Sequence, residues 1–347
     1  MTARAGQGAP SLSMDLGALR LRSGAWLPGL RVAYTCRGTR AAEGDNAILV
    51  THGFTSAHTM IEPGHLVAEG SWADLVGPGR PLDTDRYFVV CSNMLGSSFG
   101  TTGPGSLDPA TGRPWGLGFP DITLADIVEV QHRLLQALGV TRLRAVIGPS
   151  YGGFQALQWA LDHPDRVDAI GVVSSDFHSP PGLGKAQQIE RLAASPQWQG
   201  GRYHDTGGMV QTLEALRRQT LQAYGLERLY AGRGLTPQQS RERIDAASRH
   251  WAAQFDPCSL PVLAGAAEGF DVRGRLHEIR ARVLLVQANT DAVFPASEAS
   301  RGCLARVPAP TRSVTLDSPY GHMAASVELP RWSPHIAWLL GEEEKPA

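Results

Sequence analysis

The fold is decided by one stretch, Ala145-Val146-Ile147-Gly148-Pro149-Ser150-Tyr151-Gly152-Gly153. Its apolar first part predicts a buried strand, and the following Phe154 to Trp159 predicts a helix. Glycines two positions before and after the serine give the pattern G-x-S-x-G, in which a sharp turn exposes the hydroxyl. The stretch therefore predicts that Ser150 is a nucleophile between strand and helix. The alternative, an ordinary turn serine or helix N-cap, predicts nothing about distant acids or histidines.

Two residues in the C-terminal third can complete a catalytic triad with this serine. In folds with such a turn, the acid and then the base follow the nucleophile along the chain. The apolar run Val283 to Gln287 precedes Asp291, and Ser313 to Leu316 precedes His322. Because a serine hydroxyl is a weak nucleophile, an imidazole must take its proton and a carboxylate must orient the imidazole. We expect Asp291 as the acid and His322 as the general base, whereas the rival acid Asp317 caps a turn.

The loop after the apolar run Ala47 to Val50 supplies a candidate oxyanion hole. Acyl transfer needs two hydrogen-bond donors directed at the developing negative charge. We assign them to the backbone N–H groups of Phe54, in His52-Gly53-Phe54-Thr55, and of Tyr151, the residue after the nucleophile. We expect His52 itself to be a structural hydrogen-bonding residue.

Apolar runs alternate with helical patterns along the chain, which is typical of a mostly parallel sheet with helices on both faces. Residues 178–268 lack strand character and predict a helical lid insertion, so that residues 1–177 and 269–347 form the core. The first two expected strands would form an edge hairpin. The expected strands are 19–22, 30–34, 47–50, 87–91, 143–147, 169–173, 283–287 and 313–316, and the expected helices are 123–138, 152–161, 185–194, 210–224, 237–255 and 330–340.

The composition excludes several classes of function. Thirty-two basic residues balance 33 acidic ones, so no basic field exists to hold nucleic acid or an anionic membrane. The stretch Met1 to Leu16 has no apolar run of signal-peptide length and no segment is long enough to span a membrane, which predicts a cytoplasmic enzyme. The four scattered cysteines predict reduced thiols. We expect no metal or bound cofactor, and a small-molecule substrate.

Several segments resemble the homoserine O-acetyltransferase family of the α/β-hydrolase superfamily, over about residues 18 to 340. A long loop after the second core strand carries the most specific part of this resemblance, and the nucleophile, the histidine loop and the start of the lid carry the rest. These segments are Phe88 to Gly96, Gly100 to Pro104, Asp108 to Gly112, GPSYGGFQALQWA around Ser150, SPYGHM around His322, and Ser195 to Gly201.

The resemblance implies an α/β-hydrolase fold with a helical lid, and Ser150, Asp291 and His322 match the family's nucleophile, acid and base. It also implies acetyl-CoA as a co-substrate for a transferase, and a possible homodimer. Two positions depart from the family. Met323 stands where family members usually have an aspartate that meets the substrate ammonium. The family's lid arginine aligns near Leu213 or Glu214, and Arg217 or Arg218, one turn later, can substitute.

These observations leave two functions open. The first is hydrolysis of small acetyl-type esters, in which water attacks the Ser150 acyl-enzyme; the changed position Met323 favours it. The alternative is an acyl-CoA-dependent O-acyltransferase that acts on homoserine, serine or another small hydroxyl acceptor. A binding module without catalysis would be expected to lose a member of the triad, and none is missing.

Overall fold

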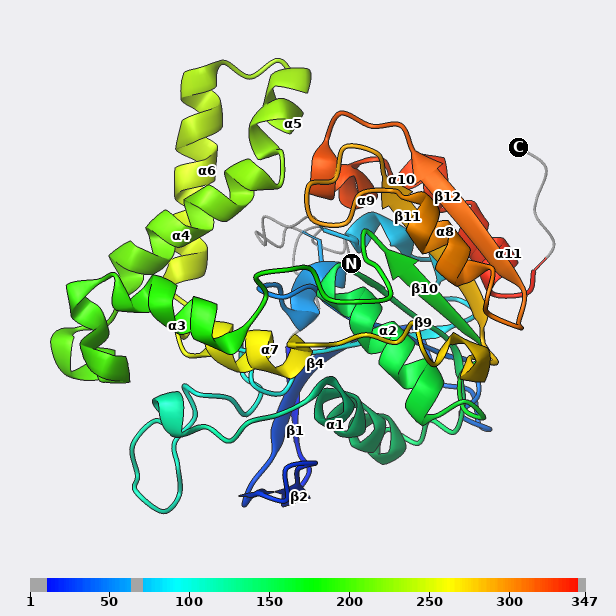
Figure 1. Cartoon of the computed structure of the whole chain (residues 1–347). Coiled ribbons are helices and arrows are strands. Elements are labelled where there is room, and N and C mark those ends of the chain that lie inside the picture. Colours follow the sequence, from blue (N-terminus) through cyan, green and yellow to red (C-terminus); the bar gives the residue numbers. More distant parts are fainter. Residues whose placement is uncertain (1–10, 64–70, 343–347) are drawn as a thin grey trace, which may run out of the picture.

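The computed structural model describes residues 11–63 and 71–342, and an eight-stranded sheet forms its centre (Figure 1). The strand order is β1-β4-β8-β5-β9-β10-β11-β12. The six strands from β8 to β12 in this order run parallel, and β4 and β1 continue the sheet antiparallel. The predicted mostly parallel sheet is confirmed. The strands are β1 (Leu12–Asp15), β4 (Arg31–Arg37), β5 (Ala47–Val50), β8 (Phe88–Ser92), β9 (Leu143–Pro149), β10 (Ala169–Val173), β11 (Arg282–Ala288) and β12 (Thr311–Leu316).

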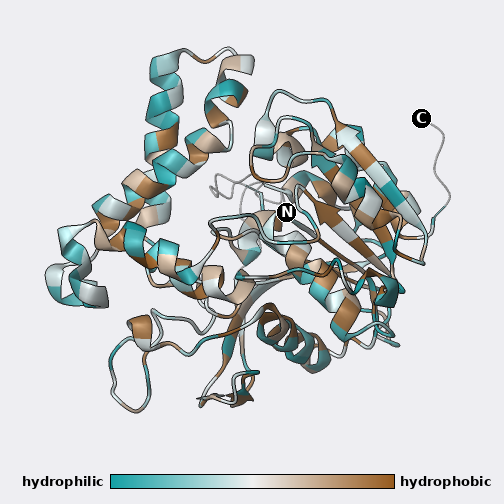
Figure 2. Ribbon diagram, in the orientation of Figure 1, coloured by the Kyte–Doolittle hydropathy of each residue, from teal (hydrophilic) through white to brown (hydrophobic). Residues whose placement is uncertain are grey.

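Helices cover both faces of the sheet, as predicted. Side chains alternate between the faces. Along β9, Val146 belongs to the apolar cluster of one face, whereas Ala145 and Ile147 belong to that of the other. Figure 2 shows how apolar residues concentrate on the strands. The first face packs against α1 (Leu124–Ala137), α2 (Tyr151–Asp162) and α8 (Glu298–Leu304), and the second against α9 (Ala324–Val327), α10 (Leu329–Trp332) and α11 (His335–Leu339).

Local signals explain where α1 begins and ends. Thr123 and Asp126 form a capping box: Asp126 N donates to Thr123 Oγ1 at 3.2 Å, and Thr123 N donates to Asp126 Oδ2 at 2.8 Å. Gly139, with a φ of 75°, ends the helix in the left-handed region. Nowhere in residues 11–63 and 71–342 is a helix long and apolar enough to cross a bilayer.

The chain between β10 and β11 is helical, as the sequence predicted, and α4 to α6 project from the core as an arm (Figure 1). The base of this region has its own apolar cluster, which includes Leu213, Trp251 and Phe255. Leu263 and Ala267 instead pack into the main core, so the last helix of the insertion covers the sheet. The limits of the lid at 178 and 268 stay a prediction. The helices are α3 (Lys185–Ala193), α4 (Val210–Ala223), α5 (Leu226–Gly232), α6 (Pro237–Ala252) and α7 (Ser259–Ala267).

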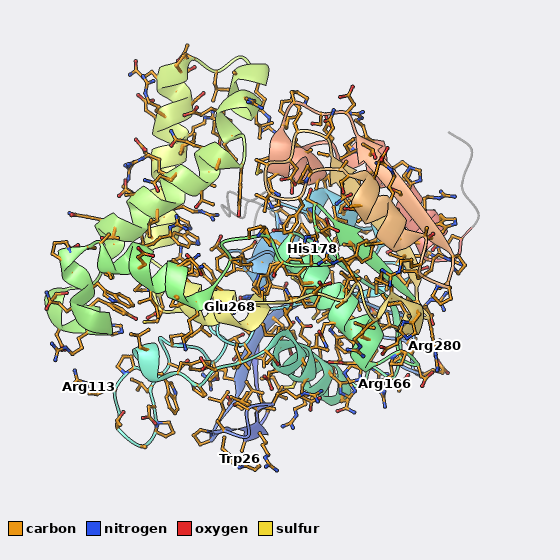
Figure 3. The ribbon with its side chains drawn as sticks, viewed as in Figure 1. Trp26, Arg113, Arg166, His178, Glu268 and Arg280 are labelled. Atoms are coloured by element: carbon orange, nitrogen blue, oxygen red, sulfur yellow. The ribbon has the colours of Figure 1, made fainter. Side chains whose placement is uncertain are left out.

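The predicted edge hairpin between residues 19–22 and 30–34 is wrong. The turn at Gly24 pairs β2 (Leu19–Arg20) with β3 (Trp26–Leu27), and β4 pairs instead with β1 and β8. Trp26 at this hairpin exposes 62% of its surface (Figure 3). Strands of two residues have too few side chains to show a period of two. The local pattern therefore does not decide which of these strands pair.

The predicted closing helix, residues 330–340, is divided into α10 and α11. Pro334 lies between them, and a proline lacks the N–H that an uninterrupted helix would need at this place.

We expect that replacing Gly148 by alanine destabilises the fold strongly. A Cβ at Gly148 would lie 2.1 Å from Thr51 Oγ1 and 2.4 Å from Thr51 O, and backbone cannot move aside without cost. Urea unfolding of Gly148→Ala should show a loss of about 3 kcal/mol. Gly302→Ala is the control, because Gly302 lies within α8 and a Cβ there meets no atom within 4 Å. This change should stabilise the protein by up to ~1 kcal/mol. Equal effects would contradict the role assigned to the close contact.

Candidate active site

Ser150 occupies a strained turn between β9 and α2. Its φ of 55° and ψ of −122° are sparsely populated for a residue with a side chain. Its N–H donates to Val173 O on the neighbouring strand at 2.8 Å. A Cβ at Gly152 would lie 2.6 Å from Thr51 O. The geometry is that of the turn predicted from G-x-S-x-G: the backbone is held by neighbouring strands and the half-buried serine projects at the end of the sheet.

Asp291 and His322 lie in the loops after β11 and β12 and are in contact. His322 Nδ1 donates to Asp291 Oδ2 at 2.8 Å, and both residues are buried. Asp291 Oδ1 accepts hydrogen bonds from the backbone N–H groups of Val293 (2.8 Å) and Phe294 (3.1 Å). Burial by itself raises the pKa of Asp291, but the charge of His322 and these hydrogen bonds outweigh it and hold the pKa below its ordinary value. A carboxylate held in its ionised form can orient the imidazole.

The rival acid, Asp317, has a different environment. It is exposed, and its Oδ1 accepts a hydrogen bond from Asn289 Nδ2 at 2.7 Å. Among the interactions of the described residues, it has none with His322.

The imidazole of His322 lies near α2, the helix that begins after Ser150, but forms no hydrogen bond to Ser150. The ring of Phe294 packs against Phe154 of α2, with centroids 5.7 Å apart, and against His322, with centroids 6.0 Å apart. Within residues 11–63 and 71–342, no hydrogen bond joins His322 to the hydroxyl of Ser150. Catalytic hydrogen bonds are often long without substrate and tighten in the complex. The three side chains thus share one end of the sheet, with the acid–base contact already formed.

Phe54 and Tyr151 are neighbours at this end of the sheet, with ring centroids 5.7 Å apart. In the described part of the chain, the backbone N–H of neither residue donates to a protein acceptor. Both donors can therefore serve a substrate oxygen. His52 is fully buried; its Nδ1 donates to Gly53 O at 2.9 Å and its Nε2 accepts from Met94 N at 3.1 Å. These bonds agree with a structural role for His52.

A cavity of about 420 Å³ extends from this region to the lid. Phe54 and Tyr224 line it at the catalytic end, and the ring of Tyr224 lies 4.6 Å from that of His322. Arg217 of α4 also lines the cavity. It is 1% exposed, its Nη1 donates to Thr55 Oγ1 at 2.6 Å, and its guanidinium lies over the ring of Trp251. The cavity thus combines aromatic walls with a buried guanidinium.

The structure distinguishes between the lid residues considered for binding a carboxylate. Leu213 is buried in the apolar cluster of the lid, and Glu214 forms ion pairs with Arg218 and Arg249. Arg218 also pairs with Asp245 and does not line the cavity. Of the two arginines, only Arg217 reaches the cavity.

Met323 is buried between the histidine loop and the lid. It is 3% exposed and packs in one cluster with Leu221 of α4, Leu226 of α5 and Ile244 of α6. The position that carries a carboxylate in the resembled family is therefore an apolar anchor here. From the sequence, Met323 stood only for the loss of an aspartate; its packing and the position of Tyr224 against His322 were not predicted. No motif marks either contact, because both join segments about 100 residues apart.

Comparisons with known proteins agree with this geometry. The family described as alpha/beta hydrolase fold matches residues 46–329. A homoserine O-acetyltransferase of Moorella thermoacetica is 37% identical over 340 residues, which cover 89% of this chain and 90% of the relative. The crystal structure of homoserine O-acetyltransferase from Bacillus anthracis superposes with a TM-score of 0.82 and 25% identity, and covers 97% of this chain and 99% of that one. Esterase E22 also has a TM-score of 0.82, at 24% identity, over 95% of this chain and 99% of that one; this likeness shows the fold alone.

The predicted fold is confirmed, and the chemistry of the class is acyl transfer by a serine enzyme. From its similarity over nearly the full length, this chain belongs to the homoserine O-acetyltransferase family of the α/β-hydrolase superfamily.

Proposed function

We propose that the chain is an acyl-CoA-dependent O-acyltransferase that passes an acetyl-type group through Ser150 to a small hydroxyl acceptor. The observation that carries this proposal is the similarity, 34 and 37% identical over 93 and 89% of the chain, to curated homoserine O-acetyltransferases. The similarity favours the transferase over the ester hydrolase that the sequence first suggested. Acetyl-CoA is then a co-substrate and not a bound cofactor.

The triad acts in two half-reactions. His322 takes the proton of Ser150 while Oγ attacks the thioester carbonyl; the C–S bond breaks and the CoA sulfur leaves with the proton from His322. The acceptor hydroxyl then attacks the acyl-enzyme, and its proton passes through His322 to Ser150 Oγ as the ester is released. Asp291 orients the imidazole and stabilises its protonated form. In both halves the N–H groups of Phe54 and Tyr151 stabilise the tetrahedral oxyanion.

Arg217 is the proposed binding group for a carboxylate of the acceptor. A guanidinium can bind a carboxylate through two parallel hydrogen bonds, and such pairs are strongest where water is excluded. Arg217 meets this condition because it is buried and lines the cavity. Its hydrogen bond to Thr55 connects it to the loop that carries Phe54. The acceptor carboxylate and the acyl carbonyl would thus be positioned by one loop.

Hydrolysis of small acetyl esters is the second candidate function, and the burial of Met323 favours it. A thioether buried among leucines cannot act as counter-ion to a substrate ammonium. When no amino-acid acceptor is bound, water attacks the acyl-enzyme and hydrolyses it. The two candidates share the acyl-enzyme and differ in what attacks it.

The first prediction separates these candidates. Purified protein is mixed with acetyl-CoA or p-nitrophenyl acetate, each with and without homoserine or serine, and release of CoA or nitrophenol is followed. We expect acetyl-CoA turnover to require an acceptor, and Ser150→Ala to lower turnover by several orders of magnitude. Ester hydrolysis that depends on Ser150 and is indifferent to acceptors would establish the hydrolase. Near-normal activity of Ser150→Ala would refute both.

The second prediction concerns Arg217. Arg217→Met should raise KM for an acceptor that carries a carboxylate by about 100-fold, since a charged hydrogen-bonded pair contributes about 3 kcal/mol, and should change KM little for a neutral alcohol of similar size. Arg218→Met is the matched control, because this neighbouring arginine pairs with Glu214 and Asp245 outside the cavity. Equal effects of both substitutions on both acceptors would rule out carboxylate binding by Arg217.

The third prediction concerns the acid. Asp291→Asn should lower kcat about 10⁴-fold with little change in KM, because an asparagine favours the wrong tautomer of His322. Asp317→Asn is the control and should retain most of the activity. A small effect of Asp291→Asn together with a large effect of Asp317→Asn would exchange the two assignments.

The lowered pKa of Asp291 predicts how the stability of the fold depends on pH. Because the folded-state pKa of Asp291 lies below the ordinary value of 3.8, its ionised form stabilises the fold fully above 3.8, and this contribution is lost as the pH falls through the lower folded value. The difference in unfolding free energy between wild type and Asp291→Asn, measured in urea, should be constant near neutrality and shrink below pH 3.8. A difference that grows on acidification would contradict the lowered pKa.

A further inference from the structure

Three potential metal ligands meet where the end of α2 that is remote from Ser150 lies against the middle of α1. Glu129 and His132 lie one turn apart on the same side of α1, and His163 follows the last residue of α2. One ligand atom from each of the three side chains lies within 4.8 Å of the others. The two imidazole rings have centroids 4.2 Å apart. No sequence motif connects these residues, because His163 lies 31 positions beyond His132.

The surrounding packing holds the two histidines in place. The ring of Trp159 lies 5.9 Å from that of His132 and 4.8 Å from that of His163. Trp159 is itself fixed, since its Nε1 donates to Gln131 Oε1 at 2.7 Å and Gln131 Nε2 donates to Gln155 Oε1 at 2.6 Å. These glutamines are fully buried between α1 and α2. Ligands that project from packed helices are positioned more precisely than ligands on loops.

A buried nitrogen of the cluster has no protein partner. Nε2 of His132 is buried and makes no hydrogen bond within the described residues, whereas nearly all buried polar side-chain atoms in proteins have a partner. His132 also lines a cavity of about 10 Å³, which Glu129 and His163 do not line. Arg166, labelled in Figure 3, lines the same cavity. The unpartnered nitrogen is therefore the observation that supports a ligand at the cluster.

The carboxylate of Glu129 is oriented for a further contact. Its Oε1 accepts a hydrogen bond from Arg133 Nε at 2.8 Å, and its Oε2 lies 3.7 Å from His132 Nδ1. Arg133 thus fixes the carboxylate through one oxygen while the other faces the histidines. Carboxylates that bind metal ions are commonly held by such a second hydrogen bond.

We propose that Glu129, His132 and His163 form a binding site for one divalent transition-metal ion, with Zn²⁺ as the best fit. Two imidazoles and one carboxylate are a ligand set of zinc sites, in which water takes the fourth position. Ligand atoms around a tetrahedral zinc ion are roughly 3.4 Å apart, so side-chain rotations suffice to close the cluster. Mg²⁺ and Ca²⁺ prefer oxygen ligands and do not suit two imidazoles.

The site lies too far from Ser150 to take part in acyl transfer. Ser150 precedes the first residue of α2 and His163 follows the last, so the helix of 12 residues separates them by about 18 Å. An ion at the site would cross-link α1 to α2 beside the buried glutamines. Binding to the folded state alone would then raise the melting temperature.

The test uses the untagged full chain after treatment with EDTA. Titration calorimetry with Zn²⁺ should give one ion per chain, and His132→Gln and His163→Gln should each weaken binding at least tenfold. Mg²⁺ and Ca²⁺ should not bind at the site. His277→Gln is the matched control, because this exposed histidine lies outside the cluster and should leave binding unchanged. Co²⁺ gives a second readout: the visible absorption bands of a tetrahedral complex should appear in wild type and be lost in both histidine variants.

Zn²⁺ affinity that is the same in wild type and in both variants would overturn the proposal, as would the absence of stoichiometric binding by wild type. Glu129→Gln keeps the shape of the side chain and the acceptor for Arg133, so weaker Zn²⁺ binding by this variant with an unchanged metal-free melting temperature excludes misfolding as the cause. None of these measurements uses turnover of acetyl-CoA or esters. Failure of the metal site therefore leaves the proposed acyl transfer untouched.

Discussion

The contact between the end of β5 and the turn around Ser150 holds the site together. Thr51 N donates to Ile147 O at 3.0 Å, and Thr51 Oγ1 donates to Gly152 O at 2.8 Å. The approach is so close that only glycine fits at positions 148 and 152. The same contact fixes the loop after Thr51, which carries Phe54. The hydrogen bonds of Thr51 thus position the candidate nucleophile and both candidate oxyanion donors, and they offset the unfavourable backbone conformation of Ser150.

The parts of the fold that could be predicted are those with a local physical signal. Parallel strands buried on both faces gave continuous apolar runs, and the carboxyl ends of β11 and of the edge strand β12 placed Asp291 and His322 at one edge of the sheet. The pairings of the first four strands could not be predicted. Short strands carry little sequence pattern, so their partners depend on which strands lie next to them in the fold. The choice between Arg217 and Arg218 was also beyond the sequence. Consecutive residues of a helix point about 100° apart, and only the docking of α4 decides which of the two faces the cavity.

Membership of the family bears on the reaction chemistry, whereas the residues that depart from the family pattern bear on the choice of substrate. The full-length similarity supports one acyl-enzyme chemistry carried by the core. In the proposed function, the acceptor is selected in the cavity between the Phe54 loop and the lid, which Arg217 lines. Proteins that share this core can differ in substrate through changes in the lid alone, while the reaction stays the same. The substrate therefore has to be argued from the lid and not from the triad.

The burial of Met323 connects His322, the proposed general base, to the arm. The neighbours of His322 in the chain are held by the lid: Met323 packs against α4, α5 and α6, and the backbone of Tyr320 runs so close to Gly225 that a Cβ there would lie 3.0 Å from its carbonyl oxygen. The imidazole consequently depends on the arm for its alignment as well as on Asp291. For the proposed triad, substitutions in the lid that change the substrate would therefore also disturb the alignment of His322, and compensating substitutions are expected across the Met323 interface.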